Sequence, residues 1–239
     1  GTSIGIADVL SSSIHKGETL GDTVKIISGY CDVLALRHSL DGSSRFAAEV
    51  SNKPVINAGS GTEEHPTQTI QDLFTIRKEK KKIDGLKIGI VGDLQYGRTV
   101  YSLLYGLSNY DVDVHLISPE SLRIRSDSTY VIKKELSYTE STTLDDYIDD
   151  LDVLYVTRIQ KERFPDEEEY ANVKDSYVIG LDMIKKMKDD AIILHPLPRV
   201  DEISTDVDKT KQAKYFEQAE YGKYTRAALL GLVLNENGF

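Results

Sequence analysis

The stretch LKIGIVGDLQYGRTVYSLLYGLSNYDVDVHLI, residues 86–117, decides the fold class of this chain. It opens with the apolar run 86–91, which has the length of a buried strand, and then passes through a glycine-containing turn. Apolar residues at helical spacing predict a helix over about 98–107, and a second apolar run predicts a strand over 112–117. A strand, a helix and another strand in this order are typical of α/β folds with parallel sheets.

The same alternation continues on both sides of this stretch. Upstream, the pattern predicts a helix over 17–30, a strand over 33–36, a helix over 44–50, a strand over 54–58 and a helix over 67–82. Downstream, it predicts a strand within 130–136, a helix over 144–150, a strand over 153–156, a helix near 181–187, a strand over 191–194 and a helix over 224–234. We therefore expect an α/β protein of two domains, each a mostly parallel sheet flanked by helices. The expected limits are 1–66 joined by the C-terminal helix 221–239, a connecting helix 67–80, and 81–220.

Composition narrows the function classes. The chain has 239 residues, a formal net charge of −10 and 40% hydrophobic residues. Because no apolar run approaches the roughly 18 residues of a membrane span, we expect a soluble protein with no membrane partner. The acidic balance argues against a nucleic-acid partner, and the basic run 77–82 is interpreted as the last turn of a helix. A single cysteine, Cys31, and the lack of a signal-peptide pattern favour the cytoplasm.

Four arginines stand just past apolar, strand-like runs: Arg37, Arg98, Arg158 and Arg199. In open α/β sheets, ligands bind at the carboxyl ends of the strands. Cations gathered there on an acidic protein indicate a small substrate that carries several negative charges.

Two of these arginines belong to motifs that suit an anion. The turn 92–99 can present backbone N–H groups and a helix N-terminus, and because it departs from G-x-G-x-x-G it favours a carboxylate or phosphate over a nicotinamide cofactor. If extended geometry continues past 153–156, Arg158 and Gln160 lie on one face, which suits a carboxylate. Surface salt bridges are the alternative interpretation of that segment.

Two His-Pro motifs also follow strands. Pro66 favours a helix start, which places His65 at a helix N-terminus, where a neutral imidazole can donate a hydrogen bond and polarise a carbonyl. A structural histidine is the alternative. In the segment 195–199, two prolines around Leu197 fix the backbone and leave carbonyls without a ladder partner, so they can accept from an ammonium group. A rigid loop without a ligand is the alternative there.

Taken together, six motifs between about Gly5 and Asn235 resemble the aspartate carbamoyltransferase catalytic chains. They are His-Lys-Gly-Glu-Thr-Leu at 15–20, Leu-Arg-His at 36–38, His-Pro-Thr-Gln at 65–68, Gly-Asp-Leu-Gln-Tyr-Gly-Arg-Thr at 92–99, Thr-Arg-Ile-Gln-Lys-Glu-Arg at 157–163 and His-Pro-Leu-Pro-Arg-Val-Asp-Glu-Ile at 195–203. The resemblance implies a carbamoyltransferase fold and an enzyme of pyrimidine biosynthesis that needs no metal or organic cofactor. Carbamoyl phosphate and L-aspartate would be its substrates, bound by the domains 1–66 and 81–220 respectively.

The resemblance also implies roles for individual residues. The implied catalytic residues are Arg37, His65 and Lys16. The implied carbamoyl-phosphate-binding residues are Arg37, His65, Gln68, Ser12 and Lys16. The implied aspartate-binding residues are Lys16, Arg98, Arg158, Gln160 and the backbone carbonyl of Leu197. Ser12 and Lys16 match a loop that reaches into the neighbouring subunit's site, so a homotrimer with shared sites is implied, and regulatory chains are a further kind of partner that the resemblance allows.

One feature of the sequence favours aspartate as the substrate, and another concerns the start of the chain. The sister ornithine carbamoyltransferases carry His-Cys-Leu-Pro where this chain has His-Pro-Leu-Pro at 195–198, and two arginines with Gln160 suit a dicarboxylate better than a cationic side chain. The family's Ser-x-Arg-Thr phosphate motif, and the acidic residue before it, would lie upstream of Gly1, so we expect the sequence to start about a quarter of the way into the family pattern. A non-catalytic fragment or assembly subunit of the family is the alternative function.

Overall fold

The computed structural model describes most of the chain. It covers residues 1–5, 17–62, 64–125, 136–159, 164, 167–173 and 176–235. The chain divides into two compact units, one of residues 1–61 with 228–239 and one of residues 62–227. The expected domain limits at 66, 81 and 220 stay a prediction.

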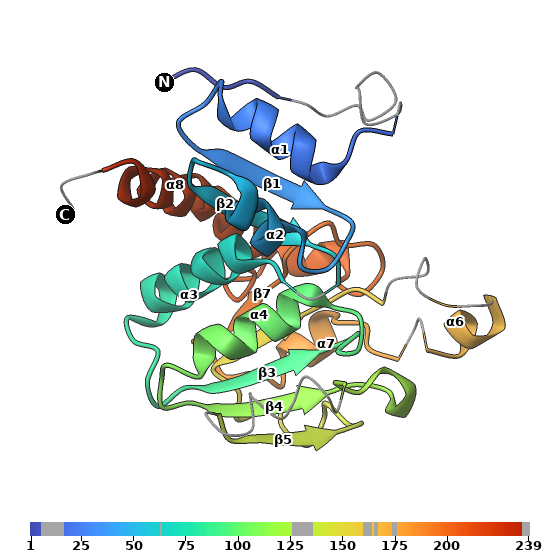
Figure 1. Cartoon of the computed structure of the whole chain (residues 1–239). Helices are drawn as coiled ribbons and strands as arrows, with labels where there is room; N and C mark the ends of the chain where they lie inside the picture. Colours follow the sequence, from blue (N-terminus) through green and yellow to red (C-terminus); the bar gives the residue numbers. More distant parts are fainter. Residues whose placement is uncertain are drawn as a thin grey trace. The chain divides into compact units, whose positions relative to one another are not determined.

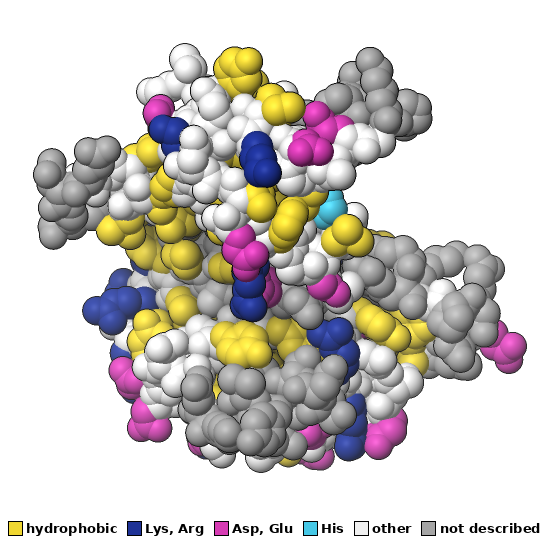
Figure 2. Space-filling view, viewed as in Figure 1, with side chains coloured by type: hydrophobic (Ala, Val, Ile, Leu, Met, Phe, Trp, Pro, Cys, Tyr) yellow, Lys and Arg dark blue, Asp and Glu magenta, His cyan; other side chains and the backbone are white. Residues whose placement is uncertain are grey.

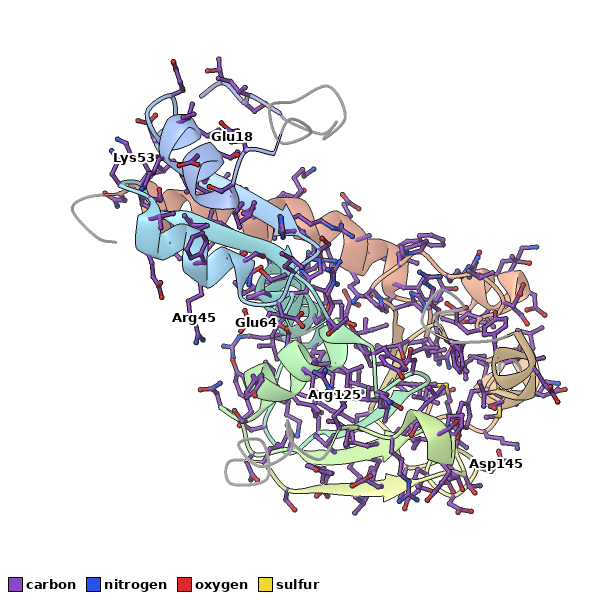
Figure 3. All side chains as sticks on the ribbon, turned by 45° about the vertical axis from the view of Figure 1, so that its right-hand side comes forward. Glu18, Arg45, Lys53, Glu64, Arg125 and Asp145 are labelled. Atoms are coloured by element: carbon purple, nitrogen blue, oxygen red, sulfur yellow. The ribbon has the colours of Figure 1, made fainter. Side chains whose placement is uncertain are left out.

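The first unit is built on a short parallel sheet. Its elements are α1 (Leu20–Ser28), β1 (Leu34–His38), α2 (Ser43–Val50), β2 (Val55–Ser60) and the end of α8 (Tyr215–Leu234). The two strands pair in parallel, and α1 begins where the Thr19 side chain accepts a hydrogen bond from the Asp22 backbone N–H at 3.2 Å. Val24, Leu34 and Ala47 form the buried centre of this unit. Figure 3 labels Arg45, which is exposed on α2.

The second unit is a five-stranded parallel sheet with helices. Its elements are α3 (Pro66–Lys80), β3 (Lys87–Val91), α4 (Arg98–Leu107), β4 (Asp113–Ile117), the 3₁₀ turn Glu120–Leu122, β5 (Tyr138–Ser141), β6 (Val153–Val156), α6 (Glu167–Val173), α7 (Leu181–Ile184), β7 (Ile192–Leu194), the 3₁₀ turn Thr205–Lys209 and α8 (Tyr215–Leu234). The strand order is β5-β4-β3-β6-β7, and every pairing among them is parallel. Figure 1 shows β3, β4 and β5 side by side, with α4 along β3. The predicted α/β class with parallel sheets is confirmed.

Two apolar layers bury the faces of this sheet. On one face, side chains of α4 such as Leu103 and Leu104 pack on Ile88 and Ile90 of β3. On the other face, Leu144, Ile148 and Leu151 pack with Val91, Leu154 and Ile193. Arg125, labelled in Figure 3, lies over the Tyr101 ring of α4, with its guanidinium carbon 4.8 Å from the ring centroid. Strands buried on both faces explain why the sequence reads as continuous apolar runs there.

Two predicted elements differ from the observed ones, and a third cannot be compared. The strand predicted within 130–136 falls mostly outside the described residues, and the strand in this region is β5, at Tyr138–Ser141. Residues 144–150 form successive turns instead of the predicted helix. The spacing of Leu144 and Ile148 reflects burial alone, because this aspartate-rich segment has poor helix propensity.

The last helix is longer than predicted, because it begins at Tyr215. Its first half buries polar groups such as Gln218, which an apolar pattern does not reveal.

Among the described residues, no helix is both long and apolar enough to cross a membrane. On the face shown in Figure 2, Lys and Arg side chains are interspersed with Asp and Glu side chains.

Candidate active site

The turn between β3 and α4 is shaped by a close approach of two strand ends. Gly92 has a φ of 121°, and a Cβ atom there would lie 2.1 Å from the Thr157 carbonyl oxygen, so only glycine fits. Asp93 Oδ1 accepts hydrogen bonds from the backbone N–H groups of Gln95 at 3.1 Å and Tyr96 at 2.9 Å. Two backbone N–H groups of the turn therefore bond within the turn itself. The positive charge of this motif comes from Arg98, the first residue of α4.

Arg158 follows the neighbouring strand β6. Thr157, just before it, holds the end of β6 on β3, because its backbone N–H donates to the Val91 carbonyl oxygen at 2.8 Å and its hydroxyl donates to the same oxygen at 3.2 Å. Arg158 is half-buried, as is Arg98. Gln160, predicted on the same face, lies outside the described residues.

The loop after β7 is held by a buried histidine. His195 Nδ1 accepts from the Leu197 backbone N–H at 2.8 Å, so its Nε2 carries the proton and donates to Glu202 Oε1 at 2.7 Å. Burial raises the pKa of Glu202, but hydrogen bonds from His195 and from backbone N–H groups outweigh it and bring that pKa below its ordinary value. Leu197 has a φ of 54°, an uncommon conformation for a residue with a side chain, and its peptide bond to Pro198 is cis.

Arg199 supports this loop. Its guanidinium pairs with both carboxylate oxygens of Asp208, with Nη2 and Oδ2 2.7 Å apart, and it lies over the Tyr215 ring. The hydrogen bond from Arg199, opposed by burial, lowers the pKa of Asp208. The fourth of the arginines that follow strands therefore serves the scaffold of the loop.

His65 and Gln68 lie at the start of α3. His65 is the N-cap residue, Pro66 is the first residue of α3, and the His65 backbone N–H donates to Ser102 Oγ of α4 at 2.8 Å. Figure 3 labels Glu64, the residue before His65. Gln68 is buried, and its Nε2 donates to Asp72 Oδ1 at 2.7 Å one turn further along the helix.

Asp72 is a buried carboxylate that the sequence reasoning missed. It is 0% exposed and accepts hydrogen bonds from Gln68, from Gln218 Nε2 at 2.6 Å and from the Tyr155 hydroxyl at 3.0 Å. Burial raises the pKa of Asp72 to about 6, although these three hydrogen bonds and the charge of Arg226 act in the opposite direction. The local signal was the pair of Gln68 and Asp72 four residues apart on one helix, since such pairs face each other.

The structure thus gathers several predicted residues within the second unit. Arg98, Arg158 and Leu197 all follow the carboxyl ends of strands that are neighbours in the sheet, at β3, β6 and β7. Adjacent strands lie about 5 Å apart, so these groups share one edge of the sheet. Gln68 is linked to the Leu197 loop because Gln218, which bonds Asp72, also accepts from the His195 backbone N–H at 2.8 Å.

Arg37 belongs to the first unit. It lies on β1 and is exposed, while the next residue, His38, accepts the Leu40 backbone N–H at 3.1 Å. Ser12 and Lys16 lie outside the described residues. In the part of the chain that the structure describes, no group of three or more His, Cys, Asp or Glu side chains is placed to hold a metal ion.

Comparisons with known proteins identify the family of this chain. The family described as aspartate/ornithine carbamoyltransferase matches with its carbamoyl-P binding domain over residues 1–78 and with its Asp/Orn binding domain over residues 84–233. The aspartate carbamoyltransferase catalytic subunit of Nitrosopumilus maritimus is 81% identical over 239 residues, which is the whole of this chain and 77% of that protein.

Solved structures are similar over nearly the whole chain. The catalytic subunit of M. jannaschii aspartate transcarbamoylase is 51% identical, with a TM-score of 0.87 over 96% of this chain and 75% of that one. Aspartate transcarbamoylase from Trypanosoma cruzi, in complex with carbamoyl phosphate and aspartate, is 37% identical, with a TM-score of 0.90 over 98% of this chain and 75% of that one. The chain therefore belongs to the aspartate/ornithine carbamoyltransferase family, and it is similar over its whole length to aspartate carbamoyltransferase catalytic subunits.

Proposed function

We propose that this chain is the enzyme that transfers the carbamoyl group of carbamoyl phosphate to the amine of L-aspartate, giving N-carbamoyl-L-aspartate and phosphate. Its membership of the carbamoyltransferase family supports the reaction class. The observation that carries the choice of aspartate is the pair of arginines, Arg98 and Arg158, at one edge of the parallel sheet beside the Leu197 loop. Two guanidinium groups match a dicarboxylate and repel a cationic side chain.

The chemistry needs groups for two charge changes. The uncharged α-amine of aspartate attacks the carbonyl carbon, a C–N bond forms, and negative charge grows on the carbonyl oxygen in the tetrahedral intermediate. The C–O bond to phosphate then breaks, phosphate leaves with that electron pair, and the nitrogen loses a proton. Donors already aimed at the oxygen stabilise the transition state more than the ground state.

For carbamoyl phosphate, the proposed donors are Arg37 and His65 to the carbonyl oxygen, with Arg37 also touching phosphate. The position of His65 at the N-terminus of the fifteen-residue helix α3 supports this role, because the helix end favours developing negative charge. Gln68 is proposed to bind the carbamoyl nitrogen, and Ser12 and Lys16 to contact phosphate.

For aspartate, Arg98, Arg158 and Gln160 are proposed to bind the two carboxylates, together with Lys16. The backbone carbonyl of Leu197 is proposed to accept a hydrogen bond from the amine. Half-burial of both arginines supports this role, because a partly desolvated guanidinium binds a carboxylate more strongly than a fully exposed one.

The wider setting is proposed from family likeness. It comprises de novo pyrimidine biosynthesis in the cytoplasm, a homotrimer whose sites are shared between subunits, and regulatory chains as further partners. Light scattering of the intact natural protein measures the subunit number directly, and a monomer that is fully active at the same concentration would contradict the shared sites.

A colorimetric assay for ureido products tests the activity. The intact natural protein should form carbamoyl aspartate from carbamoyl phosphate and L-aspartate, and no citrulline when L-ornithine replaces aspartate. Absence of product with both acceptors at saturating concentrations would contradict the enzyme and favour a non-catalytic assembly subunit. Citrulline formation would contradict the choice of aspartate.

A further inference from the structure

Asp72 is the centre of a buried hydrogen-bond network that joins two of the proposed substrate-binding groups. Its carboxylate receives three side-chain donors, which come from α3, β6 and α8. Burying a charge is costly, and an apolar residue of similar size at such a place is often neutral or stabilising. A role that an apolar residue cannot fill would explain a carboxylate at this place.

The first consequence concerns Gln68. An ionised carboxylate only accepts hydrogen bonds, so the Gln68 amide must turn its NH₂ group toward Asp72 Oδ1, at 2.7 Å. Its Oε1 oxygen is then directed away from Asp72 and is left as an acceptor. An acceptor is the group that a carbamoyl NH₂ requires, whereas the flipped amide would present a second donor.

The second consequence runs through Gln218. Its NH₂ group donates to the same Asp72 oxygen at 2.6 Å, which fixes its amide in the same way. Its Oε1 therefore faces the His195 backbone N–H, which donates to it at 2.8 Å. Because the amide is planar, the carboxylate sets the position of the backbone at the start of the loop.

The third consequence concerns the backbone of Leu197, which the His195 ring holds in place. The His195 ring accepts the Leu197 N–H through Nδ1 and is fixed in that tautomer by Glu202, which also accepts the backbone N–H groups of Val200 and Asp201 at 3.1 Å each. The left-handed backbone of Leu197, with φ 54°, is uncommon and persists where its surroundings enforce it. The direction of the Leu197 carbonyl thus depends on a chain of contacts that begins at Asp72.

We infer that Asp72 is a positioning residue for both substrates: it sets the Gln68 amide for the carbamoyl nitrogen and, through Gln218 and His195, the Leu197 carbonyl for the amine of aspartate. This inference rests on the proposed roles of Gln68 and Leu197. Tyr155 provides an internal control, because its hydroxyl bonds the other oxygen, Oδ2, and neither glutamine.

The deciding experiment is steady-state kinetics of Gln218→Met in the intact natural protein. Methionine keeps the length of the side chain but removes both hydrogen bonds, so the KM for aspartate should rise at least about tenfold, as expected for the loss of a bond to a charged group. The KM for carbamoyl phosphate should change less than about twofold, because the Gln68 arm remains. Tyr155→Phe, which disturbs the same carboxylate, should leave both KM values within about twofold of the parent.

Asp72 itself is tested by a pair of variants. Asp72→Ala should raise both KM values about tenfold or more, whereas Asp72→Asn keeps an oxygen for the two glutamines and should restore most of the activity. If Asp72→Ala does not fold, the Gln218→Met result decides. An unchanged KM for aspartate in Gln218→Met, or equal rises of both KM values in Gln218→Met and Tyr155→Phe, would overturn the inference. An inactive parent protein would instead contradict the proposed function.

Discussion

The two His-Pro motifs of the second unit look alike in sequence and differ in structure. His195 is 2% exposed, and the protein itself occupies both of its ring nitrogens, through Leu197 and Glu202. His65 is half-buried at the N-terminus of α3, where its Nδ1 lies 3.4 Å from Thr67 Oγ1. The His195 ring therefore holds the loop after β7, and the backbone of that loop is the part proposed to contact aspartate. In the first motif, the ring of His65 is itself the group proposed to contact carbamoyl phosphate.

Removing the His65 ring should give the largest effect. His65→Ala should lower kcat by about a hundredfold to a thousandfold, the usual loss for one donor to a developing oxyanion, while carbamoyl phosphate still binds. Rapid-mix kinetics and calorimetric titration of carbamoyl phosphate measure the two quantities. His115→Ala, which removes a histidine of β4 that bonds Thr139, is the matched control and should keep the parent kcat. A parent-like kcat in His65→Ala would contradict the proposed contact between the His65 ring and the carbonyl oxygen.

Asp72, whose carboxylate links the two motifs, should make the stability of the protein depend on pH. Asp72 has a pKa of about 6 in the folded chain against an ordinary value of 3.8. The folded state therefore binds the proton more tightly, so the contribution of Asp72 to stability is greatest below about pH 4 and falls as the pH rises through about 6. The difference between these pKa values corresponds to about 3 kcal/mol.

Urea unfolding of the parent and of Asp72→Asn between pH 4 and 7 measures this effect. The free energy of unfolding of the parent, relative to the variant, should fall by about 2.4 kcal/mol over that range, because the unfolded carboxyl is already partly ionised at pH 4. Asp190→Asn is the control. The exposed carboxylate of Asp190 has its pKa lowered by Lys80, so its effect should be shallow and of opposite sign. A difference between parent and Asp72→Asn that does not vary with pH would show that Asp72 is not the buried, proton-binding group described above.

The aspartate-binding role proposed around the second motif is tested at Arg158, which follows the neighbouring strand β6. Arg158→Ala should raise the KM for aspartate about tenfold to a hundredfold, because a hydrogen bond to a charged group is lost, with a smaller change in the KM for carbamoyl phosphate. Arg123→Ala, which removes a surface partner of Glu120, should leave aspartate saturation as in the parent. If aspartate saturation were unchanged in Arg158→Ala, the carboxylate assignment would fail.

Local patterns were enough for much of the fold and for placing three of the proposed site residues after strands. The helix predicted over 98–107 has those limits in the structure, and the strand at 153–156 likewise, because apolar spacing and glycine turns are local signals. Arg98, Arg158 and Leu197 could be placed at strand ends for the same reason. The shared sheet edge followed only once the order β3-β6-β7 was known.

The hydrogen bonds around Asp72 could not be predicted from the sequence. Tyr155 and Gln218 lie 83 and 146 residues from Asp72, and no periodic pattern relates hydrogen-bond partners at such separations. The pattern of the turn after β3 likewise did not predict that Asp93 accepts hydrogen bonds from two backbone N–H groups of that turn. Specific polar contacts override the general preference of a turn.

The most direct test of the division between the two motifs is the carbonyl stretching frequency of bound carbamoyl phosphate, measured by isotope-edited infrared spectroscopy in the intact protein. A ring donor on the carbonyl oxygen weakens that bond, so the frequency in the parent should lie below that of free carbamoyl phosphate. In His65→Ala it should return toward the free value, and in Gln218→Met it should stay at the parent value. A parent-like frequency in His65→Ala, or a shift in Gln218→Met as large as that in His65→Ala, would contradict the account.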